Sequence, residues 1–68
     1  MEILAERLKE LREEKRLSQN ELAKAVGLGQ SSIAHWEKPD RIPNAEAVAI
    51  LAKYFQVSAD YLLGLSND

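Results

Sequence analysis

The hydrophobic residues of this chain recur at intervals of three and four positions along most of its length. In residues 2–16 the leucines Leu4, Leu8 and Leu11 follow this spacing, which predicts an amphipathic helix with one buried face. Residues 45–55 repeat the pattern, and one face of the expected helix holds Val48, Leu51, Ala52 and Phe55. Because the periodic segments are helical, the sequence predicts an all-α fold.

Capping residues divide the region between these two segments into shorter helices. Ser18 and Glu21 have the spacing of a capping box, which predicts that a second helix begins directly after Ser18. Gly27 is placed to end this helix, because glycine readily adopts the left-handed conformation that follows a helix. Gly29 then serves as the N-cap of a third helix over residues 30–37.

The second half of the chain is divided in the same way. Asn44 and Ser58 are the expected N-caps of a fourth helix over 45–55 and a fifth over 59–63, and Gly64 ends the fifth. The connecting loop contains two prolines, and burial of Ile42 is expected to hold it in place. The sequence therefore predicts a compact five-helix domain over residues 1–64, with 65–68 as a frayed end or the start of a linker.

The second and third helices have the properties of a helix-turn-helix. Both are short, and the turn between them contains Gly27, where a β-carbon would be unfavourable at positive φ. Ala23 is small enough for the helices to cross closely. The crossing angle is expected to be fixed from below by apolar side chains, namely Leu22, Val26, Ile33 and Trp36.

The third helix has no carboxylate between Gly29 and Trp36. With Ile33 and Trp36 facing inward, a helical periodicity of about 100° per residue turns a polar, uncharged surface outward. Such a surface suits base edges in the major groove, where a recognition helix reads DNA. The candidate base-reading residues are Gln30, Ser31, Ala34 and His35. The candidate phosphate-binding residues flank them and are Gln19, Asn20, Lys38 and Arg41.

Composition narrows the other possible functions. The chain has 68 residues, no cysteine and one histidine, so we expect neither a metal site nor a cofactor. No catalytic constellation or small-molecule site is evident, and an enzyme is not expected. The longest apolar stretch is interrupted by Glu46 and Lys53 and is shorter than the roughly 20 residues that span a bilayer. We therefore expect a cytoplasmic protein without a membrane partner or signal peptide.

The formal net charge of −2 leaves two functional hypotheses open, because DNA-binding domains are usually basic. The first is a DNA-binding transcriptional regulator that gains affinity by forming a homodimer. Its dimer contact is expected at an apolar patch made of Tyr54, Tyr61, Leu62 and Leu65. The second is a protein-interaction adaptor or antitoxin-like module in which DNA binding is secondary.

Several short motifs occur together along the chain: Leu17–Ala23 (LSQNELA), Val26–Leu28 (VGL), Gln30–Ile33 (QSSI), Trp36–Glu37, Arg41–Pro43 and Val57–Gly64 (VSADYLLG). Over about residues 7–64, this combination resembles the lambda-repressor/Cro-like helix-turn-helix family, also called the XRE family. The resemblance implies a five-helix, lambda-repressor-like domain that binds palindromic operators as a dimer, most often as a repressor.

The resemblance also implies individual residue roles. Arg12 and Glu37 are expected to form an ion pair beneath the recognition helix. Base contacts are implied for Gln30, Ser31, Ala34 and His35, and a phosphate contact for Gln19. The chain departs from the family pattern at three positions, where Gly29 replaces a common Ser or Thr, Pro39 replaces a glycine, and Asp40 replaces a residue that is often basic.

Overall fold

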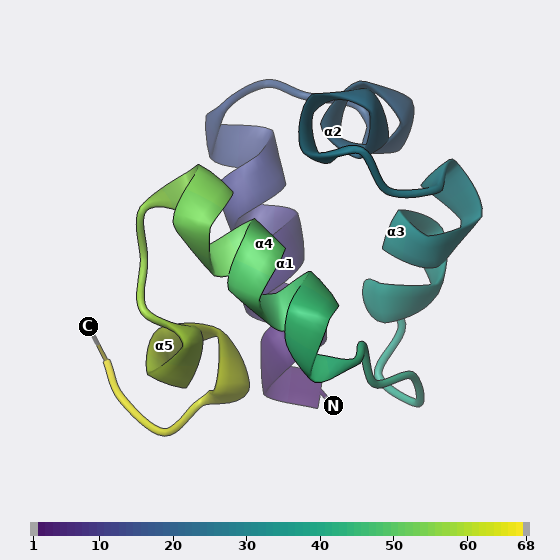
Figure 1. Ribbon diagram of the computed structural model, residues 1–68. Helices are drawn as coiled ribbons and strands as arrows, with labels where there is room; N and C mark the ends of the chain where they lie inside the picture. The colour runs from purple at the N-terminus through teal and green to yellow at the C-terminus, as the bar shows by residue number, and fades with distance from the viewer. Residues whose placement is uncertain (1, 68) are drawn as a thin grey trace.

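The computed structural model describes residues 2–67, and this part of the chain folds into five α-helices without a strand (Figure 1). The helices are α1 (Glu2–Glu14), α2 (Gln19–Val26), α3 (Gln30–Trp36), α4 (Ala45–Phe55) and α5 (Ala59–Leu63). In Figure 1, α1 lies behind α4, with α2 and α3 on one side of this pair and α5 on the other. The predicted all-α fold with five helices is confirmed.

The core is formed by apolar side chains from all five helices. The largest fully buried side chains are Leu4, Leu8, Leu22, Ile33, Leu51 and Leu62. The buried face predicted for the fourth helix is confirmed, since Val48, Leu51, Ala52 and Phe55 are all buried. Because α2 and α3 each place a buried side chain in this core, the core fixes the orientation of the pair.

The predicted caps are present. Ser18, Asn44 and Ser58 accept hydrogen bonds at 2.8–3.0 Å from backbone N–H groups in the first turns of α2, α4 and α5. Gly27 and Gly64 end α2 and α5 in the left-handed conformation. Gln56 ends α4 in the same conformation at a φ of 58°, although it carries a β-carbon.

The first helix is shorter than predicted. Periodicity suggested a helix to residue 16, whereas α1 ends at Glu14. Arg16 adopts a φ of 57°, and the Leu17 N–H donates to the Arg12 carbonyl at 3.1 Å. The chain therefore turns away from the helix axis before Leu17, and this turn leads directly into the cap of α2.

The loop between α3 and α4 is held by a different residue from the one expected. The prediction that Ile42 is buried is wrong, because its exposed fraction is 70%. Pro43 is buried instead. A residue that precedes proline is restricted to extended conformations, in which neighbouring side chains point to opposite sides. Burial of Pro43 therefore turns Ile42 outward.

The apolar patch predicted near the C-terminal end differs in composition. Leu62 is not part of it, because the inner face of α5 places this side chain in the core with 1% exposure. The Tyr61 ring lies beneath the Arg7 guanidinium at 4.2 Å, and Lys15 Nζ lies 5.6 Å from the centre of the Tyr54 ring. Of the four predicted residues, only Leu65 is largely exposed, at 75%.

Residues 65–67 lie against the first helix. The Arg7 guanidinium donates to the Tyr61 carbonyl, to the Ser66 carbonyl at 2.8 Å and to Asn67 Oδ1 at 3.4 Å. The ranges 1–64 and 65–68 predicted from the sequence begin and end at Met1 and Asp68, which lie outside the described residues. Within residues 2–67, no helix is long and apolar enough to cross a membrane.

Candidate nucleic-acid interface

The interface is built on the α2–α3 pair, whose first helix is capped reciprocally. Ser18 Oγ accepts a hydrogen bond from the Glu21 N–H at 3.0 Å, and Glu21 Oε1 accepts one from the Ser18 N–H at 2.8 Å. Both hydrogen bonds with Ser18 lower the pKa of the exposed Glu21 carboxyl below its ordinary value. The bond from the Ser18 backbone has the larger effect, and the bond with the Ser18 side chain has the smaller. The N-terminal end of α2 is therefore fixed by a charged hydrogen-bond acceptor.

The turn after α2 sets the position of α3. Gly27 adopts a φ of 73°, and the Leu28 N–H donates to the Ala23 carbonyl at 3.0 Å. Gly29 provides the N-cap of α3 without a side-chain hydrogen bond. The small side chain of Ala23 is 97% buried, as expected where two helices approach closely.

The outward surface of α3 is largely as the periodicity suggested. Ile33 is fully buried, and Trp36 packs on the edge of the core. Gln30, Ser31 and His35 are exposed, whereas Ala34 is half-buried. The described helix contains no carboxylate, so hydrogen-bonding groups and one methyl group line its accessible side. Such a surface can approach a polyanion without electrostatic repulsion.

The candidate phosphate-binding residues lie at the start of α2 and after the end of α3. Gln19 and Asn20 open α2, and Lys38 and Arg41 follow α3, where both basic side chains are exposed. Arg41 Nε lies 3.9 Å from Asp40 Oδ2, and both groups are largely exposed. A solvent-exposed pair of this kind is weak, but Asp40 reduces the positive potential around Arg41.

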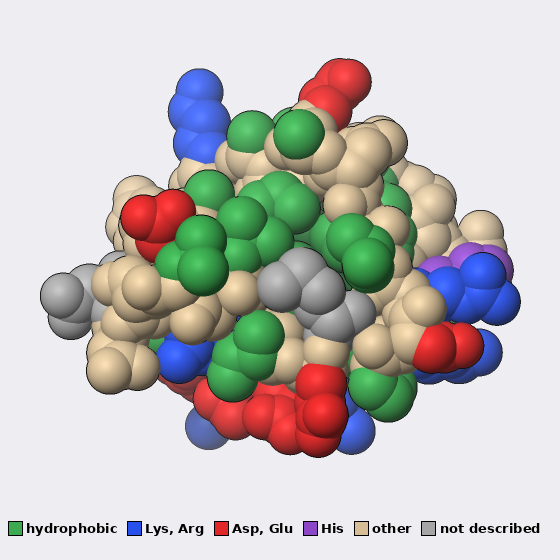
Figure 2. Space-filling model, turned by 90° about the horizontal axis from the view of Figure 1, so that it is seen from below, with side chains coloured by type: hydrophobic (Ala, Val, Ile, Leu, Met, Phe, Trp, Pro, Cys, Tyr) green, Lys and Arg blue, Asp and Glu red, His purple; other side chains and the backbone are tan. Residues whose placement is uncertain are grey.

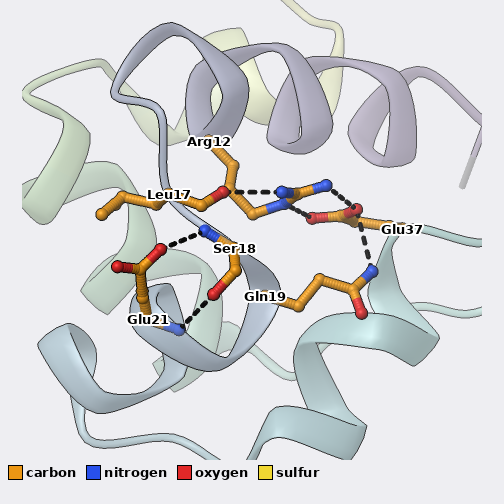
Figure 3. Close-up of polar contacts among 6 residues, drawn as sticks. All are labelled: Arg12, Leu17, Ser18, Gln19, Glu21 and Glu37. Carbon is orange, nitrogen blue, oxygen red and sulfur yellow. Dashed lines mark hydrogen bonds and ion pairs between the residues drawn. The ribbon is translucent and has the colours of Figure 1, made fainter.

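Arg12 and Glu37 lie beneath the interface and join α1 to the end of α3 (Figure 3). Arg12 Nε donates to Glu37 Oε2 at 2.7 Å, and Nη2 donates to Oε1 at 3.0 Å. Arg12 Nη1 also donates to the Leu17 carbonyl at 2.7 Å. The hydrogen bonds to Glu37 raise the pKa of the Arg12 guanidinium against the opposing effect of burial, so the guanidinium stays charged.

Gln19 makes a contact that the sequence did not reveal. Its side-chain nitrogen donates to Glu37 Oε1 at 3.2 Å, so the network extends from α1 through the end of α3 to the start of α2 (Figure 3). Gln19 and Glu37 are 18 residues apart, and no motif spacing links them. Only the crossing of α2 and α3 brings these two side chains together.

The fold and this interface define a helix-turn-helix domain of the lambda-repressor type. A family comparison agrees, since the profile of the helix-turn-helix family matches residues 8–62. The chain belongs to this family. The resemblance to lambda-repressor/Cro-like proteins that was predicted from short motifs is confirmed.

Individual relatives support this assignment. The chain is 36% identical over 63 residues to the uncharacterized HTH-type transcriptional regulator YobD of Bacillus subtilis, covering 93% of the chain and 56% of the relative. It is also 36% identical to repressor protein C2 of Salmonella phage P22 over 62 residues, covering 91% and 29%. The chain therefore spans about half the length of the first relative and less of the second.

A solved structure is similar over the whole domain. The P22 c2 repressor in complex with a synthetic operator matches with a TM-score of 0.86 and 33% identity. The match covers 97% of this chain and 100% of the repressor chain in that crystal structure.

Proposed function

We propose that this domain binds double-stranded DNA sequence-specifically as part of a transcriptional regulator, acting as a repressor with α3 in the major groove. The observation that carries this proposal is the carboxylate-free outer surface of α3, held in place by a rigid helix-turn-helix. The similarity to a repressor bound to its operator supports the same conclusion.

The exposed residues of α3 supply suitable chemistry for base recognition. Gln30 can form two hydrogen bonds with adenine, and Ser31 can donate to or accept from either kind of base pair. The methyl group of Ala34 suits contact with thymine. His35 lies one turn beyond Ser31, where its ring nitrogens extend the hydrogen-bonding surface. These four residues would contact the base edges that one copy of the domain recognises.

Binding to the DNA backbone would come from Gln19 and Asn20 at the start of α2 and from Lys38 and Arg41 after α3. The contact of Gln19 with Glu37 brings the start of α2 next to the end of α3. Only two of the four residues are cationic, and Asp40 lies beside Arg41. Counterion release by one copy would therefore contribute little affinity. This modest charge favours binding as a pair of copies.

We infer that the pair is a homodimer on a palindromic operator. Two copies joined by a twofold axis would place two α3 helices in successive major grooves, about 34–36 Å apart. The exposed side chains of Ile42 and Leu65 provide apolar surface outside the core for such a contact. Figure 2 shows hydrophobic side chains gathered on the face that carries α5 and the start of α4, with the histidine at one end of this face.

Selection of binding sites from random duplex DNA tests the proposal. We expect one enriched motif with twofold symmetry and a half-site separation of one helical turn. The variant Gln30→Ala should weaken binding to the selected duplex by about 1–3 kcal/mol and relax selection at one base position in each half-site. An enriched motif without symmetry would refute the homodimer while leaving DNA binding in place.

Glu46→Ala is a matched control for Gln30→Ala, because Glu46 is exposed on α4 and is not one of the candidate DNA-binding residues. A salt titration separates this proposal from a protein-interaction adaptor. Binding through phosphates weakens steeply with salt, whereas an apolar protein contact does not. Absence of any enriched sequence would contradict the proposed function and favour the adaptor.

A further inference from the structure

The Glu37 carboxylate connects the interior of the domain to a residue at the proposed DNA surface. Arg12 donates to both of its oxygens, and Gln19 Nε2 donates to Oε1 at 3.2 Å (Figure 3). The Glu37 side chain is 5% exposed and the Arg12 side chain 12%, so the pair is shielded from water. The carboxylate is therefore held rigidly before any ligand arrives.

A fixed carboxylate selects one orientation of the Gln19 amide. An ionised carboxylate only accepts hydrogen bonds, whereas an amide has a donating nitrogen and an accepting oxygen. If the Gln19 amide were reversed, its oxygen would face Glu37 Oε1 and the two acceptors would repel each other. Glu37 therefore keeps the amide nitrogen next to the carboxylate.

The amide nitrogen has a second hydrogen, which the bond to Glu37 leaves for another acceptor. Gln19 is the first residue of α2, directly after the Ser18 cap, and the first backbone N–H groups of a helix also favour an anion. The side-chain hydrogen and these backbone groups belong to the same end of the helix. A phosphate oxygen is an acceptor that both can share.

We propose that Glu37 is a positioning residue for DNA binding, which orients the Gln19 amide so that its second N–H donates to a phosphate of the bound duplex. This inference rests on the proposed function. In this arrangement Arg12 has two effects, because it fixes the carboxylate and neutralises a negative charge close to the DNA backbone.

Because Glu37 is charged, the direction in which its substitution changes DNA affinity is informative. Removing a negative charge near DNA should strengthen binding if general electrostatics were the only effect. If Glu37 acts by orienting Gln19, the variant Glu37→Gln should weaken binding instead, because a glutamine at this position can face Gln19 with either its oxygen or its nitrogen.

A double-mutant cycle tests the inference with the duplex selected as described above. Gln19→Met keeps the length of the side chain and removes its donors, and we expect about tenfold weaker binding. Glu37→Gln should weaken DNA binding by a similar factor. The double variant should bind about as well as the weaker single variant, because Glu37 cannot position a donor that is absent.

A parallel cycle with Asn20→Ala provides the control. Asn20 is exposed and adjacent to Gln19, and it is itself a candidate phosphate-binding residue. The effects of Asn20→Ala and Glu37→Gln on affinity should therefore multiply. Circular dichroism should show that each variant is folded. If Glu37→Gln is not, Glu37→Asp replaces it, because aspartate keeps the charge beside Arg12 and shortens the reach toward Gln19.

Two results would overturn the inference while the proposed function stands. Suppose that Glu37→Gln weakens DNA binding equally in the unchanged protein and in the Gln19→Met variant. Glu37 would then act only by stabilising the fold. Tighter binding by the Glu37→Gln variant would mean that the carboxylate merely repels DNA. Failure of the unchanged protein to bind any selected duplex would instead refute the proposed function, and this inference with it.

Discussion

Gly27 and Gly64 have nearly the same backbone conformation but very different surroundings. Their φ angles are 73° and 79°, in the left-handed region that a β-carbon disfavours. A β-carbon at Gly27 would meet nothing within 4 Å, whereas at Gly64 it would lie 2.6 Å from Ile3 Cγ2. Gly64 is therefore required both by its conformation and by the close approach of α1.

We expect Gly64→Ala to be clearly more destabilising than Gly27→Ala. Left-handed strain alone should cost about 1 kcal/mol at either position, and the overlap with Ile3 adds about 1–3 kcal/mol at Gly64. Urea denaturation gives both values. Combining Gly64→Ala with Ile3→Ala should recover part of the loss, since the overlapping atoms are then absent. Equal destabilisation by the two single alanine variants would contradict this explanation.

At the scale of helices, local signals located the boundaries well. Ser18, Asn44 and Ser58 cap helices as predicted because a capping bond joins residues only three positions apart. The early end of α1 depends on Arg16, which lacks such a signal. Exposure of Ile42 follows from burial of its neighbour Pro43, and the sequence pattern does not show which of two adjacent apolar residues faces the core.

The candidate site was predictable to a similar extent. The outward residues of α3 follow from helical periodicity and two inward anchors. The ion pair between Arg12 and Glu37 was implied only by family resemblance, since the two residues are 25 positions apart. The bond from Gln19 to Glu37 depends on the crossing of helices, and neither periodicity nor motif specifies it. Contacts that depend on tertiary packing were thus the least predictable from the sequence.

The capping box of α2 predicts a dependence of stability on pH. Its hydrogen bonds lower the pKa of Glu21 in the folded protein, so folding favours the ionised form. This stabilisation is fully present above the pKa of unfolded glutamate, about 4.3, and is lost as the pH falls through the lower folded value. Glu21→Gln keeps a hydrogen-bond acceptor and does not titrate. The free energy of unfolding of this variant should therefore fall less between pH 7 and pH 3 than that of the unchanged protein.

Urea denaturation at the two pH values measures this difference. Glu10→Gln is the matched control, because Glu10 is an exposed carboxylate of α1 outside any cap. It should leave more of the acid sensitivity in place than Glu21→Gln does. If Glu21→Gln lost as much stability as the unchanged protein on acidification, the capping carboxylate would not be the source of the effect.

At the scale of the whole molecule, charge is distributed unevenly although its sum is only −2. Figure 2 shows a run of acidic side chains along one margin of the face, and both basic and acidic side chains at the end that carries the histidine. Helix α3 itself contains no carboxylate, and the exposed Lys38 and Arg41 follow it. This asymmetry reconciles a negative domain with the proposed binding of DNA.

Arg7 closes the domain by joining α1 to the residues that follow α5. Its guanidinium donates to the carbonyls of Tyr61 and Ser66 and lies over the Tyr61 ring. Hydrogen bonds from a charged group contribute about 1.5–3 kcal/mol each, and part of this is offset by ordering the chain. Arg7→Met keeps the apolar stem and should lower the free energy of unfolding by about 1–2 kcal/mol.

The same substitution should release residues 65–67, and this local effect distinguishes the proposed contact from general destabilisation. Heteronuclear NOE values measured by NMR should fall for these residues in Arg7→Met, while those of α2 and α3 remain unchanged. Lys9→Met removes a charge from an exposed position of the same helix and should have neither effect. Unchanged NOE values at Ser66 and Asn67 would mean that the backbone bond from the Leu65 N–H to the Asp60 carbonyl, at 2.8 Å, is sufficient to hold this segment. Loss of order confined to residues 65–67 would instead show that the direction in which the chain leaves α5 is set by a side chain of α1.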